Sequence, residues 1–301
     1  MSVARPIFKG VKLMLTRRVR GRTLLLRPSK RTDQIVGYVV AVMSKRWKIK
    51  VHALIVLGNH YHATCEDPDG AIVDFQRDAH HFITKGLNAQ HGEFEAMWAS
   101  QPTSRVACEE PGDMVNKIAY TMANPVEAGL VRYGSSWPGL RRAWPSKPRT
   151  FKRPPKYFRG PDQGGRWPDE ATLEFERPSG YEDLSDDELA DVIQTAIDDR
   201  EQTFRDERDA AGKPFLGRRK VLAQSRHSQP RTREPRFGIS PTVACRNKWL
   251  RIERLKANKE WRADYRTALA RWRAGDRNVE FPYGTYRMRV LHGARCALAP
   301  D

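Results

Sequence analysis

The sequence lacks the features that define several large classes of protein. Its 301 residues include only 4 cysteines, which lie far apart and form no Cys-x-x-Cys pair. This pattern excludes a local zinc signature and predicts a reduced, cytoplasmic setting. No apolar run approaches the length of a membrane span, and the basic, strand-like start does not match a signal peptide. We therefore expect no membrane partner.

Acidic residues are also in short supply. The chain has 54 Lys and Arg residues against 36 Asp and Glu residues, a formal net charge of +18. The excess of positive charge is concentrated between Lys213 and Asp301, a segment with 22 basic residues and 7 acidic ones. Such a field attracts a phosphate backbone whatever its sequence. Basicity by itself suits DNA, RNA or an anionic membrane surface, so the partner must be inferred from motifs.

A pair of histidines follows a buried-strand pattern. Residues 51–57 are mostly apolar and lead into Gly58-Asn-His60-Tyr-His62. Side chains two apart on a strand share a face, so His60 and His62 point together while Tyr61 points away. Two adjacent imidazoles on a rigid strand form half of a metal site. By itself, a His-x-His pattern is equally typical of a metal site and of two histidines with a purely structural role.

A helix is predicted about sixty residues further on. Asp113 is a candidate cap, and apolar residues follow at a spacing of four: Met114, Ile118 and Met122. Tyr120 and Asn124 are four apart and share one face. Pro125 predicts that the regular helix ends or kinks near Asn124. The spacing alone is more typical of a solvated helix face.

The element pattern predicts an α+β fold. Strands are expected at residues 8–16 and 23–26, a helix at 31–46, and then the histidine strand, a helix at 72–88 and the tyrosine helix. We expect three regions: a core at 1–140, a Pro/Gly-rich connector at 141–184, and a helical, strongly basic extension at 185–301. The frequent prolines and glycines predict that the connector is irregular and lies on the surface or along DNA.

The extension contains two predicted helices. Ser185 and Glu188 form a capping box in front of the first. The second spans 242–273 and interleaves an aromatic stripe with arginines. Its default interpretation is an amphipathic packing helix, and the alternative is a helix whose basic face lies along DNA. The candidate phosphate-binding residues are Arg17 and Arg18 in the first strand and, in this helix, Arg246, Arg251, Arg254 and Arg262.

Taken together, these segments resemble a known family. His60-Tyr61-His62 resembles the HUH motif, and residues 117–131, which include Tyr120 and Asn124, resemble the tyrosine helix of the REP-associated tyrosine transposases. These are single-tyrosine HUH nucleases related to transposases of small bacterial insertion sequences. The resemblance covers about residues 8–140.

The resemblance implies a fold and a chemistry. The fold would be a ferredoxin-like or RRM-like antiparallel sheet with helices on it. His60, His62 and Asn124 would hold one divalent metal, Mg²⁺ or Mn²⁺, and Tyr120 would attack the scissile phosphate. The protein would cut and rejoin single-stranded DNA near palindromic hairpins through a 5′-phosphotyrosine, in the nucleoid-associated cytoplasm. The resemblance is compatible with a monomer and with a homodimer.

Two other functions are compatible with parts of the sequence. One is a catalytically silent, regulatory protein that binds DNA hairpins without cutting them. The other is an RNA-binding protein with an RRM-like sheet, which the lack of an aromatic RNP strand pattern disfavours. The complete set His60, His62, Tyr120 and Asn124 favours the nuclease.

Overall fold

The histidine strand lies at the centre of one mixed sheet. The computed structural model describes residues 4–230 and 241–299. In chain order the strands of the sheet are β1 (Val11–Arg18), β2 (Lys50–Val56), β3 (His60–Asp67), β4 (Ser104–Cys108), β5 (Arg141–Ala143) and β8 (Val243–Ala244). They lie in the order β5-β2-β3-β1-β4-β8, and every pair is antiparallel except β4 with β8.

The first half of the chain has the ferredoxin-like topology. Strand β1 is followed by α1 (Lys30–Trp47), the pair β2–β3, α2 (Ile72–His91) and β4. This is the β-α-β-β-α-β unit with the fourth strand beside the first and β3 between β1 and β2. The predicted α+β class and the ferredoxin-like sheet are therefore confirmed.

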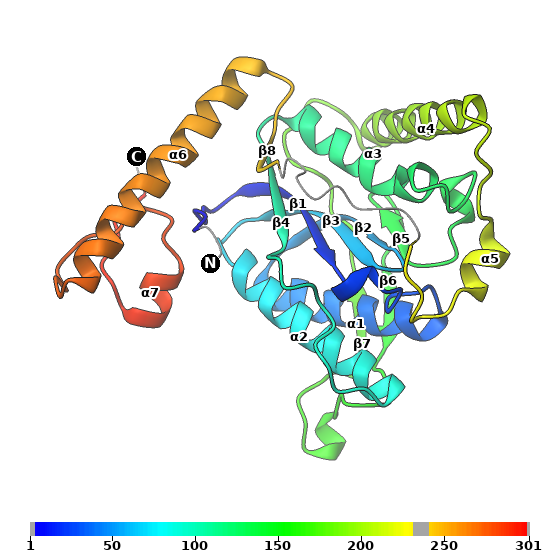
Figure 1. Cartoon of the computed structure of the whole chain (residues 1–301), viewed down its shortest axis with the longest axis horizontal. Coiled ribbons are helices and arrows are strands. Elements are labelled where there is room, and N and C mark those ends of the chain that lie inside the picture. Colours follow the sequence, from blue (N-terminus) through cyan, green and yellow to red (C-terminus); the bar gives the residue numbers. More distant parts are fainter. Residues whose placement is uncertain (1–3, 231–240, 300–301) are drawn as a thin grey trace.

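Helices cover both faces of the sheet (Figure 1). Alternation along β3 points Tyr61, Ala63 and Cys65 toward α1 and α2, where they join the main core. The opposite face, which carries His60 and His62, is covered by α3 (Pro111–Glu127), and α4 (Asp186–Ala210) packs on α3. The side chains of β3 thus divide into a structural set and a polar set.

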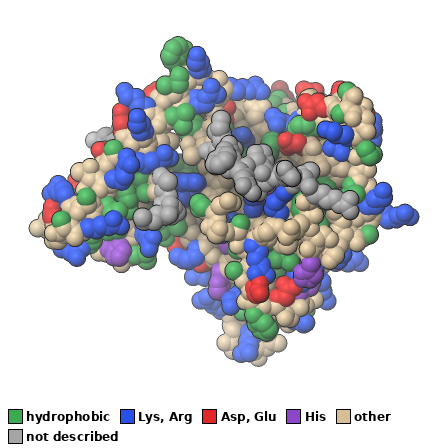
Figure 2. Space-filling model, in the orientation of Figure 1, with side chains coloured by type: hydrophobic (Ala, Val, Ile, Leu, Met, Phe, Trp, Pro, Cys, Tyr) green, Lys and Arg blue, Asp and Glu red, His purple; other side chains and the backbone are tan. Residues whose placement is uncertain are grey.

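The C-terminal part forms a smaller unit beside the sheet. It contains α6 (Lys248–Arg273) and α7 (Arg287–His292). Helix α5 (Arg218–Ala223) lies apart from them on the main body (Figure 1), where Val221 joins the main core. A separate apolar cluster holds α6 and α7 together: Ala268, Val279, Phe281, Met288 and Ala294. Its attachments to the rest of the molecule include the backbone hydrogen bond from Ile7 to Gly284, the stacking of Phe8 on Tyr283 and the hydroxyl of Tyr286 donating to Asp74 of α2. Lys and Arg side chains are spread over its surface (Figure 2).

The connector prediction is wrong in one respect. Residues 141–184 were expected to be irregular and superficial, yet they supply β5 and a hairpin of β6 (Arg149–Lys152) with β7 (Glu170–Leu173). Their apolar side chains belong to the main core: Phe151, Phe158, Trp167, Leu173 and Phe175. Proline and glycine frequency marked the turns, but it did not reveal the aromatic residues that pack between them. The three predicted boundaries themselves remain predictions.

Smaller corrections concern element ends. Residues 23–26 form an irregular segment and not the predicted strand. Leu24 and Leu26 are buried there, and their amides donate hydrogen bonds to the carbonyls of Ser228 and Gly58, respectively. Helix α3 continues past Asn124 to Glu127 with Pro125 in its last turns. The final long helix begins only at Lys248, because residues 243–244 pair with β4.

The Ser185 capping box is confirmed. The described residues also include three single turns of 3₁₀ helix: Arg20–Arg22, Gly134–Ser136 and Pro161–Gln163.

None of the helices within residues 4–230 and 241–299 combines the length and the apolar character needed to cross a membrane.

The packing of the hairpin on α1 gives a stability prediction. A Cβ atom added at Gly37 of α1 would lie 2.2 Å from the ring of Phe151. Gly37→Ala should therefore lower the free energy of unfolding by about 1–3 kcal/mol, the usual range for overpacking a filled core. Gly112→Ala is the matched control, because nothing lies within 4 Å of its Cβ position. Urea unfolding followed by circular dichroism compares the two, and equal midpoints would refute the packing.

Candidate metal and tyrosine site

The two histidines of β3 point their outer nitrogens at one another. Nε2 of His60 lies 3.0 Å from Nε2 of His62, and the ring centroids are 4.7 Å apart. Two ligand atoms at about 2.1 Å from one ion and at a right angle to each other lie about 3.0 Å apart. The pair therefore has the spacing of two adjacent ligands of one metal ion.

A hydrogen-bond partner at Nδ1 orients each imidazole ring. Nδ1 of His60 lies 2.7 Å from Oδ1 of Asn59, and Nδ1 of His62 lies 2.8 Å from Oγ1 of Thr16 on the neighbouring strand. The register of β1 with β3 sets the second contact, because Thr16 is paired directly with His62. Such partners fix ring orientation and leave Nε2 for a ligand role.

Both rings are neutral at neutral pH. Burial, followed by the positive charge of Arg18, lowers the pKa of His60 to about 4. Burial also holds the pKa of His62 well below its usual range, with further contributions from His60, Arg18 and Lys117. A neutral imidazole keeps the lone pair that a metal ligand requires.

Helix α3 brings Tyr120 and Asn124 to the same place. The ring of Tyr120 lies edge-on to His62, with centroids 5.6 Å apart. Asn124 is buried, and its side chain hydrogen-bonds with both His60 and Tyr120. The helical spacing of four thus produces the shared face that the sequence predicted. The structure brings together His60, His62, Tyr120 and Asn124.

Positive charges surround the phenol. Lys117, one turn earlier on α3, and Arg200 of α4 both lie 5.7 Å from the centroid of the Tyr120 ring. Burial raises the pKa of Tyr120, Glu127 raises it further, and Arg200 and Arg18 oppose them. Arg200 was not among the sequence candidates. Its position follows from the packing of α4 on α3, which no local pattern in the sequence reveals.

The candidate arginines divide into separate groups. Arg18 is paired with His60 in the sheet and lies at the site. Arg17 points to the other face, where it donates to the carbonyl of Gln101 and lies 5.8 Å from the Trp98 ring. The four arginines of the C-terminal part lie toward the other end of the sheet, on or just before α6: Arg246, Arg251, Arg254 and Arg262.

Specific contacts fix that second location. Arg254 pairs with Glu109 at 2.8 Å, next to Cys108, which is paired with Lys12 of β1. Lys12 is six residues from Arg18, and strands rise by about 3.3 Å per residue, so about 20 Å of strand separates the two ends. The predicted set of arginines therefore does not form one surface at the histidines.

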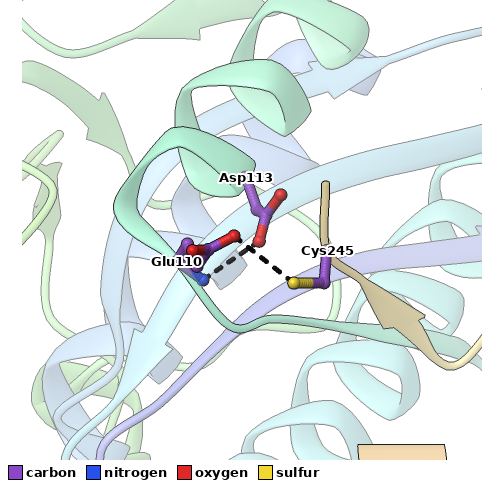
Figure 3. Close-up of side chains that lie close together, drawn as sticks. All are labelled: Glu110, Asp113 and Cys245. Atoms are coloured by element: carbon purple, nitrogen blue, oxygen red, sulfur yellow. Dashed lines mark hydrogen bonds between the residues drawn. The ribbon is translucent and has the colours of Figure 1, made fainter. Parts of the chain in front are cut away.

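A different cluster lies at the start of α3 (Figure 3). Ligand atoms of Glu110, Asp113 and Cys245 lie within 4.8 Å of one another, a spacing that one ion can bridge. Their polar atoms already have partners: the Asp113 carboxylate accepts the amides of Glu110 and Arg246, and the Cys245 thiol donates to Glu110. Burial, then the hydrogen bond to Glu110, raises the pKa of Cys245 and keeps it protonated. The cluster joins β8 to α3.

Comparisons with known proteins give partial matches. No protein-family model and no curated protein match the chain. A solved REP-associated tyrosine transposase bound to a REP hairpin shares 22% identity over 46% of this chain and 81% of that chain, with a TM-score of 0.39. A Deinococcus radiodurans R1 protein, provisionally described as a transposase, shares 13% identity over 37% of this chain and 89% of that chain, with a TM-score of 0.29.

The position of Arg200 predicts a measurable effect on the phenol. Arg200→Gln removes a cation that lowers the pKa of Tyr120, so this pKa should rise, while Arg200→Lys should retain most of the effect. Carbon-13 labelling of the tyrosine ring resolves the titration by NMR, and the signal lost in Tyr120→Phe identifies the residue. An unchanged midpoint in Arg200→Gln would exclude the contact.

Proposed function

We propose that the chain is a metal-dependent single-stranded DNA endonuclease and strand transferase of the transposase type, acting near palindromic hairpins. The observation that carries this proposal is the convergence of four side chains from β3 and α3: His60, His62, Tyr120 and Asn124. Separate elements about sixty residues apart supply a potential nucleophile and a ligand set on one face of the sheet.

The donor set suits a divalent cation. His60 and His62 offer two neutral nitrogens at ligand spacing, and Asn124 offers an amide oxygen beside them. No thiolate is present, which favours Mg²⁺ or Mn²⁺ over softer ions. A cation held by these three residues would polarise the scissile phosphate and offset the charge that develops on it.

Tyr120 supplies the nucleophile. Its oxygen would form a bond to the scissile phosphorus while the bond from phosphorus to the 3′ oxygen breaks. The tyrosine loses its proton, the 3′ oxygen gains one, and the 5′ phosphate stays on the protein. The attack reverses when a 3′ hydroxyl returns, so strand joining needs no nucleotide hydrolysis.

The surrounding charges would assist this step. Lys117 and Arg200 flank the ring, and the charges of Arg200 and Arg18 favour its ionised form over the neutral phenol. Arg18, paired with His60 at the edge of the site, would contact a phosphate of the substrate strand. The hairpin stem would be bound through shape and phosphates, while unpaired flanking bases remain open to direct recognition.

The nucleophile is tested by trapping the covalent product. Purified protein is incubated with labelled single strands that carry hairpins from the flanks of its own gene, with Mg²⁺ or Mn²⁺. A protease-sensitive adduct should appear on a denaturing gel with the wild type and be absent with Tyr120→Phe. Tight hairpin binding without an adduct in the wild type would favour the silent, regulatory hairpin-binding protein instead.

The metal set is tested by separate substitutions. His60→Ala and His62→Ala should each lower the rate of adduct formation by roughly 100-fold or more, since about 3 kcal/mol of charge stabilisation is lost. Hairpin affinity should change little. His292→Ala, exposed on α7, is the matched control. A chelator should abolish the adduct and added Mn²⁺ should restore it; a rate that is insensitive to the chelator would refute the metal.

A further inference from the structure

A cavity of about 490 Å³ lies between the N-terminal segment, strands β1 and β4, and helix α6. Its size is in the range of small-ligand pockets. It opens on the α1–α2 side of the sheet, because Leu13 and Val11 line it along with Ile72 of α2. The metal and tyrosine site occupies the other face and the other end, so the cavity is a separate feature.

The cavity gathers positive charge that the described carboxylates neutralise only in part. Arg5, Arg105 and Arg262 all line it. Within the described part of the chain, Arg5 donates only to a backbone carbonyl, that of Thr103, at 3.2 Å. Arg105 has no side-chain hydrogen bond or ion pair within the described ranges, although the charge of Asp67 acts on it. Nε of Arg262 is buried with no acceptor there.

The nearby carboxylates are already engaged. Glu109, the acidic residue of the lining, pairs with Arg254, a fourth arginine of the cavity, at 2.8 Å. Asp67 accepts the amides of Ala71 and Ile72 at the start of α2. Three guanidinium groups therefore face one cavity with no carboxylate at ion-pair distance among the described residues, and the charge of Asp67 acts on Arg105 from further away.

Mutual repulsion of these groups is visible in their ionisation. Burial, and then the charge of Arg5, lowers the pKa of Arg105 to about 10. Burial, and then the charge of Arg262, lowers the pKa of Arg5. Partly buried like charges destabilise the free chain, and a bound anion would relieve that penalty. Arginine forks match the oxygens of a phosphate in particular.

The rest of the lining is apolar and aromatic. Ile7, Phe8 and Leu13 form one part, and Trp261 of α6 forms another. The indole of Trp261 donates to the carbonyl of Tyr283 at 2.7 Å, which fixes its orientation. Phe8 is held by stacking on Tyr283, with centroids 5.3 Å apart. A volume far larger than a phosphate and walled in this way suits a planar base.

We propose that this cavity binds one nucleotide, with its phosphate on Arg5, Arg105 and Arg262 and its base against Phe8 and Trp261. The nucleotide comes either from free solution or from a nucleic-acid strand. The proposal does not depend on Tyr120 chemistry, and it explains why arginines of α6 lie far from the histidines.

The test measures binding to the full chain carrying Tyr120→Phe, so that no covalent step contributes. Deoxyadenosine 5′-monophosphate, inorganic phosphate and a hexadeoxyadenylate are titrated by calorimetry. Arg105→Gln and Arg262→Gln should each weaken binding of the mononucleotide or the hexamer by about tenfold or more. Arg273→Gln, which removes an exposed arginine at the end of the same helix, should leave it unchanged.

Thermal unfolding separates loss of binding from loss of fold. The free Arg105→Gln chain should melt at the same temperature as its parent or higher, because an unpaired, partly buried charge has been removed. Its melting temperature should no longer rise with the nucleotide. A free chain that melts lower and binds weakly would mean that Arg105 is structural, and would overturn the assignment.

The probes distinguish the sources. Binding of the mononucleotide as tight as that of the hexamer indicates a free nucleotide; a hexamer that binds much more tightly, in an Arg105-dependent way, indicates a strand. Inorganic phosphate binding as tightly as the mononucleotide would overturn the role of the base. Absence of any binding that depends on Arg105 and Arg262 would overturn the whole proposal. A failure of the Tyr120 adduct bears on none of these outcomes.

Discussion

The antiparallel pairing of β1 with β3 is the constraint on which the candidate site depends. It places Thr16 opposite His62 and Arg18 opposite His60. A slip of one residue would turn both histidines toward α1 and α2 and bring Tyr61 to the polar face. The register is held by the apolar residues that alternate with the polar ones, so the packing of the core also sets the geometry of the chemistry.

The side chains of α3 then complete the site because the helix crosses the polar face of the same strands. Its apolar residues pack on the sheet, and its start is tied to β8 through the cluster of Glu110, Asp113 and Cys245. Tyr120 and Asn124 lie near the histidines as a result of this docking. Helix α4 holds the outer side of α3 and contributes Arg200, so the extension is part of the site's surroundings.

Short-range patterns predicted much of the fold. Period-two alternation located the histidine strand, and a spacing of four placed Tyr120 and Asn124 on one face. The capping box at Ser185 marked the start of α4. These signals are local: each needs only neighbours along one element, and backbone geometry fixes what they imply.

Contacts between distant segments were beyond the reach of such patterns. Arg200 meets Tyr120 only because α4 docks on α3, and Cys245 meets Glu110 only because a two-residue strand pairs with β4. The aromatic residues around Trp167 lie among prolines and glycines, where no period reveals burial. The density of positive charge along the sequence did not reveal its location either, because the basic residues of α6 lie at the end of the sheet that is far from the histidines.

The small apolar cluster shared by α6 and α7 has a consequence for motion. A unit with a core of a few side chains opens at a lower free energy than the larger core of the sheet. Amides of α6 should accordingly exchange with solvent hydrogen faster than those of β3. Because Arg262 and Trp261 belong to this unit while Arg105 belongs to the sheet, each such opening divides the arginine cavity into two halves.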